Sequence, residues 1–182
     1  MDGRWNLDSG EQGRRRRRKK KNPAEPDDHA LGRSRGGFST KIHVLCDRLG
    51  HPLHFHLTAG QSHEAMSLMN LIEDAEVVDH EGRSIGYPQR VAGDKAYRAN
   101  WIDEYLLELG IEPVIPSREN ESASRPVLHF DRKAYRQRNI IERLIGWLKE
   151  CRRIGTRFEK TALNFAGFVK MAIIQRYLKL IT

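Results

Sequence analysis

The sequence contains few cysteines and no long apolar run. Cys46 and Cys151 lie far apart in the chain, which argues against a disulfide framework and indicates free thiols in a reducing compartment. No segment approaches the ~18 consecutive apolar residues that a membrane span requires. The basic N-terminus also lacks the apolar core of a signal peptide. We therefore expect a cytoplasmic protein with no membrane partner.

Excess positive charge is absent from most of the chain. The sequence has 32 Lys and Arg against 24 Asp and Glu, a formal net charge of +8. All of this excess lies in one unbroken run of cations, made up of Arg14, Arg15, Arg16, Arg17, Arg18, Lys19, Lys20 and Lys21. Like charges repel and bury no apolar surface, so we expect a disordered arm that binds DNA phosphates. A solvated tail without a role is the alternative.

Apolar periodicity is missing from residues 1–37, which we interpret as a basic arm that retains at most a remnant of a first strand. Beyond this arm, strands are predicted at Thr40–Cys46, Pro52–Leu57, Gln89–Gly93 and Ile111–Ile115. Helices are predicted at about Ser62–Val78, Asn100–Leu109, Asp131–Arg153 and Lys160–Ile181. Strands that alternate with helices indicate a single α/β domain over residues 38–182.

A polar stripe follows one side of the helix predicted over Asp131–Arg153. Tyr135, Arg138, Glu142 and Lys149 fall at steps of three, four and seven residues, within a sector of about 60° on an ideal helix. Four apolar residues occupy the neighbouring sector, so the helix can bury them and hold a carboxylate beside the buried seam, where it could bind a metal. A solvated helix face with a weak ion pair between positions 138 and 142 is the alternative.

This spacing resembles the signature of DDE transposases in the insertion-sequence four and five superfamily, five-type group. Other stretches resemble the same family, namely Ala30–Gly37, Ser39–His43, Gly60–Glu64, Gly93–Tyr97 and Pro113–Pro116. In order along the chain, the resemblance covers about residues 19–180. It implies a bacterial transposase that cleaves DNA and transfers strands by two-metal phosphoryl transfer.

The resemblance also implies a fold and roles for particular residues. The fold would be an RNase H-like mixed sheet flanked by helices, with further C-terminal helices. Asp94, after a central strand, and Glu142, on a later helix, would be catalytic carboxylates that bind Mg²⁺, with Mn²⁺ as a substitute. Tyr135, Arg138 and Lys149 would contact the DNA backbone near the scissile phosphate.

The implied partners are double-stranded DNA, both element ends and target, and further subunits. The chain would act as a homo-oligomer or together with a full-length transposase subunit. The family's helical N-terminal region, which implies recognition of terminal repeats, has no match in a chain starting at Met1. We therefore expect a second reading frame or a decayed copy. The alternative functions are a truncated, inactive remnant that only binds DNA, and a nuclease on the same fold.

The family's third carboxylate has only imperfect candidates. Asp8 follows an extended-looking Trp5-Asn6-Leu7 and is our candidate for a catalytic metal ligand. Asp2 is the alternative, although a frayed terminus holds a ligand poorly. If neither works, the site lacks a ligand.

Three histidines raise the separate possibility of zinc binding. His43, His54 and His56 fall on neighbouring predicted strands, but they lack cysteine or carboxylate partners at zinc-finger spacing. We therefore expect surface histidines. Glu64 falls at a helix start, where a carboxylate favours the positive end of the helix dipole, so a capping role is at least as well supported as a catalytic one.

Overall fold

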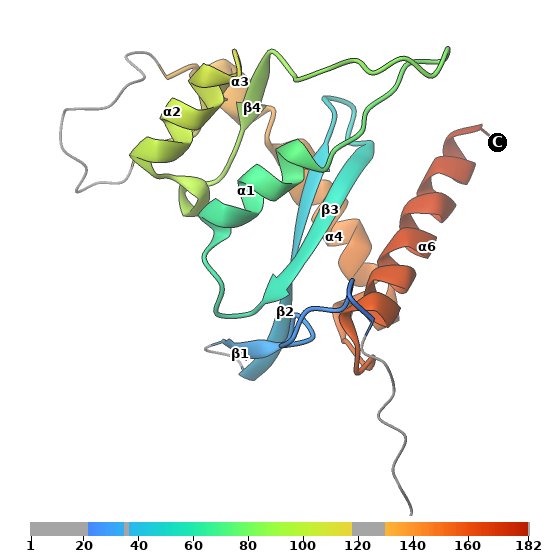
Figure 1. Ribbon diagram of the computed structural model, residues 1–182. Coiled ribbons are helices and arrows are strands. Elements are labelled where there is room, and N and C mark those ends of the chain that lie inside the picture. Colours follow the sequence, from blue (N-terminus) through green and yellow to red (C-terminus); the bar gives the residue numbers. More distant parts are fainter. Residues whose placement is uncertain (1–21, 35–36, 118–129, 182) are drawn as a thin grey trace, which may run out of the picture.

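Two small sheets form the framework of the protein in the computed structural model, which describes residues 22–34, 37–117 and 130–181 (Figure 1). The antiparallel sheet contains β1 (Gly32–Ser34), β2 (Gly37–Cys46) and β3 (Pro52–Ala59). The parallel pair contains β4 (Arg90–Ala92) and β5 (Glu112–Val114). The predicted α/β class and the four predicted strands are confirmed.

Helices occupy most of the remaining described residues. They are α1 (Glu64–Glu73), the 3₁₀ helix η1 (Lys95–Tyr97), α2 (Asn100–Glu108), α3 (Arg132–Arg136), α4 (Asn139–Glu150), α5 (Arg152–Gly155) and α6 (Ala162–Ile181). The structure describes no helix long and apolar enough to cross a membrane.

Two helix predictions need correction. The first helix was expected to reach Val78 but ends at Glu73, and Val78 instead forms an isolated bridge with Ser84. The helix expected over residues 131–153 is divided into α3, α4 and α5. Between α3 and α4, the amides of Gln137 and Arg138 bond to carbonyls three residues earlier, a tighter turn than an α-helix makes.

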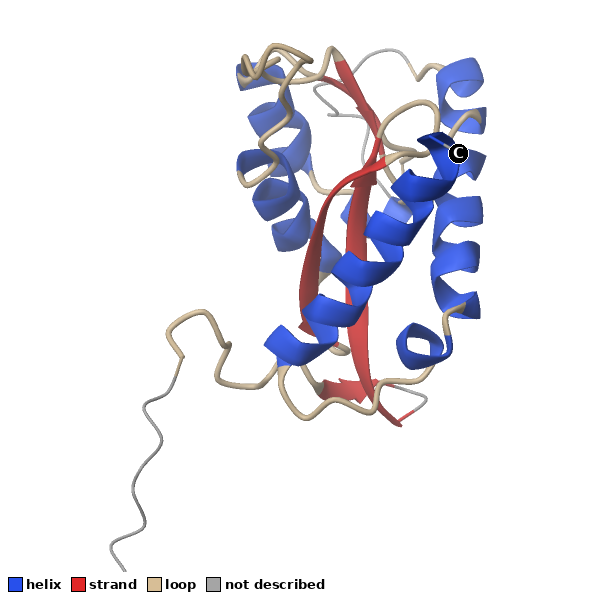
Figure 2. Ribbon diagram, turned by 90° about the vertical axis from the view of Figure 1, so that its right-hand side faces the viewer, coloured by secondary structure: helices blue, strands red, loops and turns tan. Residues whose placement is uncertain are grey.

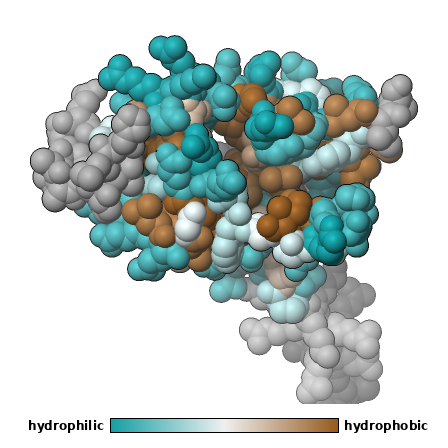
Figure 3. Space-filling model, turned by 90° about the horizontal axis from the view of Figure 1, so that it is seen from above, coloured by the Kyte–Doolittle hydropathy of each residue, from teal (hydrophilic) through white to brown (hydrophobic). Residues whose placement is uncertain are grey.

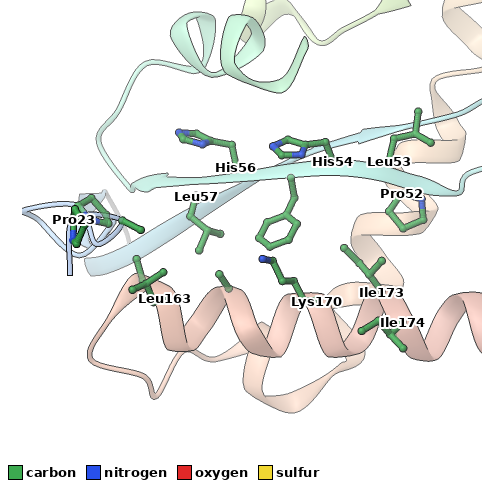
Figure 4. Close-up of a pocket in the computed structure, with 15 residues that line it drawn as sticks. Pro23, Pro52, Leu53, His54, His56, Leu57, Leu163, Lys170, Ile173 and Ile174 are labelled. Atoms are coloured by element: carbon green, nitrogen blue, oxygen red, sulfur yellow. The ribbon is translucent and has the colours of Figure 1, made fainter. Parts of the chain in front are cut away.

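The β2–β3 hairpin is packed on both faces. Helix α1 contacts both strands, and α6 lies across them on the other side (Figures 1 and 2). Figure 4 shows Leu57 directed toward α6, and His54 and His56 on the opposite side of β3. Phe55 and Leu57 join the apolar cluster beneath α6, whereas Leu53 lies outside it and is 38% exposed.

A second apolar cluster fills the space around the parallel strands. It brings together α1, β4, α2 and β5 through Leu68, Ile72, Val91, Ile102, Leu106, Ile111 and Ile115. Burial of such aliphatic side chains supplies most of the stability of a domain of this size. The cluster fixes β4 against two helices and so determines where the residues after β4 emerge.

The described part of the predicted arm, residues 22–34, contacts the body of the protein. The Glu25 carboxylate accepts hydrogen bonds from the backbone amides of Ala162 (2.7 Å) and Leu163 (2.9 Å), at the positive end of α6. Burial alone would raise the pKa of Glu25, but these amides and His29 outweigh burial and hold it below its ordinary value. Arg157 donates to the carbonyls of residues 29 and 30.

Candidate active site

Asp94 lies directly beyond the parallel strand β4. Its backbone caps η1, because its carbonyl accepts a hydrogen bond from the amide of Tyr97 at 3.0 Å. Its side chain makes no capping hydrogen bond and is 56% exposed. The strand and the short helix therefore hold the backbone of Asp94 and leave its carboxylate directed outward.

Ion pairs tie the segment that carries the polar stripe to β4. Arg90, at the start of β4, contacts Asp131 at 3.3 Å and Glu112 of β5 at 2.9 Å. Asp131 also caps α3 by accepting from the amides of Lys133 and Ala134. These contacts are partly exposed and individually weak, but together they bring α3 and the start of α4 beside the strand that leads to Asp94.

Arg138 joins the two predicted catalytic carboxylates. One guanidinium nitrogen lies 2.7 Å from the Glu142 carboxylate, and another lies 3.9 Å from that of Asp94. The Arg138 side chain is 20% exposed, whereas those of Asp94 and Glu142 are 56% and 55% exposed. The structure thus brings Asp94 and Glu142, which lie far apart in the sequence, to two nitrogens of one guanidinium group.

Tyr135 supports this arginine from the preceding helix. The Arg138 guanidinium carbon lies 5.2 Å from the centre of the Tyr135 ring, a cation–π distance. Phe130 packs against the same ring, with centroids 5.3 Å apart. Tyr135, Arg138 and Glu142 therefore form one group, although they no longer belong to a single straight helix.

The remaining predicted site residues stand apart from this group. Lys149 lies in the last turn of α4 and is exposed, about 10 Å along the helix from Glu142. Among the described side chains, no ion pair connects Lys149 to either carboxylate. Asp8 and the alternative Asp2 lie outside the described residues, as does the cationic run from Arg14 to Lys21.

A polar network that no pattern in the sequence predicted lies next to the segment that carries Asp94. His43 is buried, and its ring nitrogens contact the Tyr97 hydroxyl at 2.8 Å and the Thr58 hydroxyl at 2.9 Å. Burial, with a smaller contribution from His56, lowers the pKa of His43 to about 4, so this imidazole is neutral near pH 7. The prediction of a surface histidine is wrong for His43, because its strand face is covered by η1.

A second polar pair joins two more of the motifs. Lys41 of β2 contacts the carboxylate of Glu64 and the carbonyl of Ser62. Glu64 lies in the first turn of α1, where no side-chain capping hydrogen bond forms, and its contact with Lys41 fixes the helix to the sheet. Burial raises the pKa of Tyr97 to about 12, and the charges of Glu64 and Asp94 add to this shift. Lys41, Glu64 and Tyr97 all belong to stretches that resemble the family, but the sequence does not indicate that their side chains meet.

The site offers part of what a divalent metal needs. Asp94 and Glu142 supply hard carboxylate oxygens that converge on one cation, the chemistry preferred by Mg²⁺. No cluster of three or more His, Cys, Asp or Glu suited to a metal occurs in the described part of the chain. A two-metal centre bridges several carboxylates, so the described residues fit such a centre only in part.

Comparison with known proteins identifies the family of the chain. The sequence profile of the family described as "Transposase DDE domain" matches residues 12–175. The chain is 30% identical, over 140 residues, to the "Putative transposase for insertion sequence element IS402" of Burkholderia cepacia, a match that covers 76% of this chain and 62% of that relative. It is 28% identical over 141 residues to the "Putative transposase for insertion sequence element IS6501" of Brucella ovis, covering 78% of this chain and 99% of the relative. No solved structure is significantly similar to the chain.

Proposed function

Because the chain belongs to the Transposase DDE domain family, we propose that Asp94 and Glu142 are the metal-binding carboxylates with which it cleaves and joins the ends of an insertion element. The observation that carries this proposal is their convergence on Arg138, at 3.9 Å and 2.7 Å. One carboxylate follows a strand and the other lies on a helix, so the packing of α4 beside β4 brings both to the same arginine. The arrangement supports an RNase H-like fold for residues 38–182.

The chain's own residues have separable tasks in this proposal. Asp94 and Glu142 hold Mg²⁺ or Mn²⁺, which supplies activation of the attacking oxygen and stabilisation of the leaving oxygen. Asp8 is proposed as a further ligand. Arg138 and Lys149 neutralise phosphate charge on double-stranded DNA, and Tyr135 orients the Arg138 guanidinium. Positioning and charge neutralisation account for most catalysis of phosphoryl transfer.

The proposed reaction can be tested with purified chain and labelled duplexes that carry the two ends of its own insertion element. We expect cleavage that leaves 3′-hydroxyl ends, followed by joining to target DNA, with Mg²⁺ or Mn²⁺ and not with EDTA. Cleavage without joined products would indicate a nuclease instead. Retention of DNA with neither product would overturn the proposal and favour an inactive remnant.

The cationic run from Arg14 to Lys21 is proposed to bind DNA without sequence preference. Its replacement by eight serines should weaken binding to all duplexes alike and flatten the salt dependence, by about 0.9 in the logarithmic slope for each phosphate that the run neutralises. Titrations by fluorescence anisotropy at several salt concentrations measure both effects. A variant with the eight cations in reverse order is the matched control and should bind like the wild type. An unchanged slope in the serine variant would show that the run is inert.

A further inference from the structure

The turn that follows β4 is too short to be stable by itself. Asp94 leads into η1, a single 3₁₀ turn closed by the hydrogen bond from the Tyr97 amide to the Asp94 carbonyl. A 3₁₀ turn has poorer hydrogen-bond geometry than an α-helix, and one helical turn alone is not stable in water. None of the three residues of η1 is fully buried. Contacts from outside the turn must therefore hold its backbone, and with it the backbone of Asp94.

Tyr97 makes such contacts along the whole length of its side chain. Its Cβ atom lies over the residue before Asp94, since a Cβ atom placed on Gly93 would be 3.7 Å from it. The side chain packs against the apolar cluster around the parallel strands. The hydroxyl lies 2.8 Å from the Nδ1 atom of His43, and the two rings meet edge-on. Tyr97 thus connects the turn after β4 to β2.

His43 is held at both of its ring nitrogens. Nε2 lies 2.9 Å from the hydroxyl of Thr58 on β3, and the residue is only 3% exposed. A neutral imidazole has one donor and one acceptor nitrogen, and a hydroxyl can be the partner of either. Both polar atoms of this buried ring are therefore satisfied, which favours one orientation of the ring. Thr58, His43 and Tyr97 form an imidazole bridge of two hydrogen bonds from the hairpin to the turn.

The Asp94 side chain depends on this backbone for its direction. It makes no capping hydrogen bond. Its contact with Arg138, at 3.9 Å, is longer than a hydrogen bond. A displacement of about 1 Å in a group that takes part in a reaction can lower the rate roughly a hundredfold. Whatever holds the turn after β4 therefore also decides how well Asp94 can act.

We propose that Tyr97 and His43 are positioning residues for Asp94. The imidazole bridge anchors the turn after β4 to β2 and so directs the Asp94 carboxylate toward Arg138. Neither residue touches the reacting atoms. The catalytic value of this anchor rests on the proposed function, in which Asp94 is a metal ligand, whereas the anchor itself is a property of the free protein.

Tyr97→Phe tests the anchor, because it removes the hydroxyl and keeps the ring that packs against the apolar cluster. We expect the backbone amides of residues 94–98 to exchange with deuterium about tenfold faster in this variant, since the turn opens more often. Hydrogen exchange of the full chain, followed by mass spectrometry, measures this rate without metal or DNA. Exchange within α6 should not change, which separates local opening from a general loss of stability.

Tyr105→Phe is the matched control. Tyr105 packs against the same apolar cluster, and its hydroxyl donates to the Glu73 carboxylate at 3.0 Å. It belongs to α2, at the end of the molecule that Figure 3 shows from above, where hydrophilic and apolar side chains share the surface. The control removes a tyrosine hydrogen bond of similar length away from the turn. Residues 94–98 should therefore exchange at the wild-type rate.

Thr58→Val tests the far end of the imidazole bridge. It keeps the shape of the side chain and removes the hydroxyl that holds the second nitrogen of His43. Because His43 and Tyr97 lie between Thr58 and the turn, faster exchange at residues 94–98, by about threefold, would show that the effect passes through the imidazole. Tyr97→Phe/Thr58→Val should exchange no faster than Tyr97→Phe, since the bridge is already broken.

Cleavage of the element-end duplexes gives the second readout. Tyr97→Phe should lower kcat about tenfold and leave KM for DNA within about twofold, because a misplaced carboxylate impairs the reaction and not the phosphate contacts. Unchanged exchange at residues 94–98 in Tyr97→Phe would overturn the proposal, and so would equal acceleration in Tyr105→Phe. Faster exchange with an unchanged kcat would confirm the anchor and count against the catalytic role of Asp94, that is, against the proposed function alone.

Discussion

Asp94→Ala and Glu142→Ala are each expected to reduce metal-dependent cleavage to below about one thousandth of the wild-type rate, the scale on which a principal electrostatic group contributes. The reason is that each variant removes one of the two carboxylates that contact Arg138 and that we propose as metal ligands. DNA retention should change by less than about threefold, because binding rests mainly on phosphate contacts by cations. Cleavage rates and anisotropy titrations on the same duplexes separate the two effects.

The conservative variants Asp94→Asn and Glu142→Gln sharpen this test. They keep side-chain volume and remove the charge that a metal requires, so they should be nearly as inactive as the alanine variants. Glu150→Ala is the matched control, since Glu150 is an exposed carboxylate at the end of the same helix. Cleavage that persists in either charge-removing variant would refute the site assignment.

Asp103→Ala is expected to lower the free energy of unfolding by about 3–5 kcal/mol, the usual cost of removing one partner of a buried ion pair. Asp103 lies 3.1 Å from Arg98, and both side chains are completely buried. The variant leaves the Arg98 charge in the interior without the Asp103 carboxylate, while its hydrogen bond to Asn100 at 2.8 Å remains. Urea denaturation followed by circular dichroism measures the difference.

Two further variants show whether the buried charge is the cause. Glu104→Ala removes an exposed carboxylate from the same helix and should change the unfolding free energy by less than about 0.5 kcal/mol. Arg98→Met/Asp103→Leu removes both charges and should recover most of the loss. A loss as large in the double variant as in Asp103→Ala would show that packing, and not an uncompensated charge, dominates. Since Arg98 follows η1, we also expect Asp103→Ala to weaken the placement of Asp94.

Local patterns in the sequence were sufficient to predict most of the helices and strands. The strand predicted at Pro52–Leu57 is β3, and the helix predicted at Asn100–Leu109 differs from α2 by one residue at its end. These patterns succeed because the side-chain period of a strand or helix is a property of a few neighbouring residues. The same reasoning failed for α1, which was predicted to reach Val78, because a bridge to Ser84 holds that residue outside the helix.

Long-range contacts decided what the sequence could not. The amides at the start of α6 are capped by Glu25, a partner 137 positions away from Ala162, and no local pattern indicates such a pairing. His43 is buried because Tyr97 covers it, although its own neighbours suggest an exposed face. In both cases the relevant partner is distant in the chain, so only the packed structure identifies it.

The sequence by itself determined the α/β class, the family and the identity of Asp94 and Glu142 as candidate catalytic residues, because residue type and spacing carry that information. Only the tertiary structure decided that Arg138 contacts both carboxylates, that Lys149 stands apart from them, and that His43 is buried against Tyr97. These features depend on how the sheets and α4 pack together. Packing depends on many contacts between residues that are distant in the chain, and the pattern within one segment does not reveal those contacts.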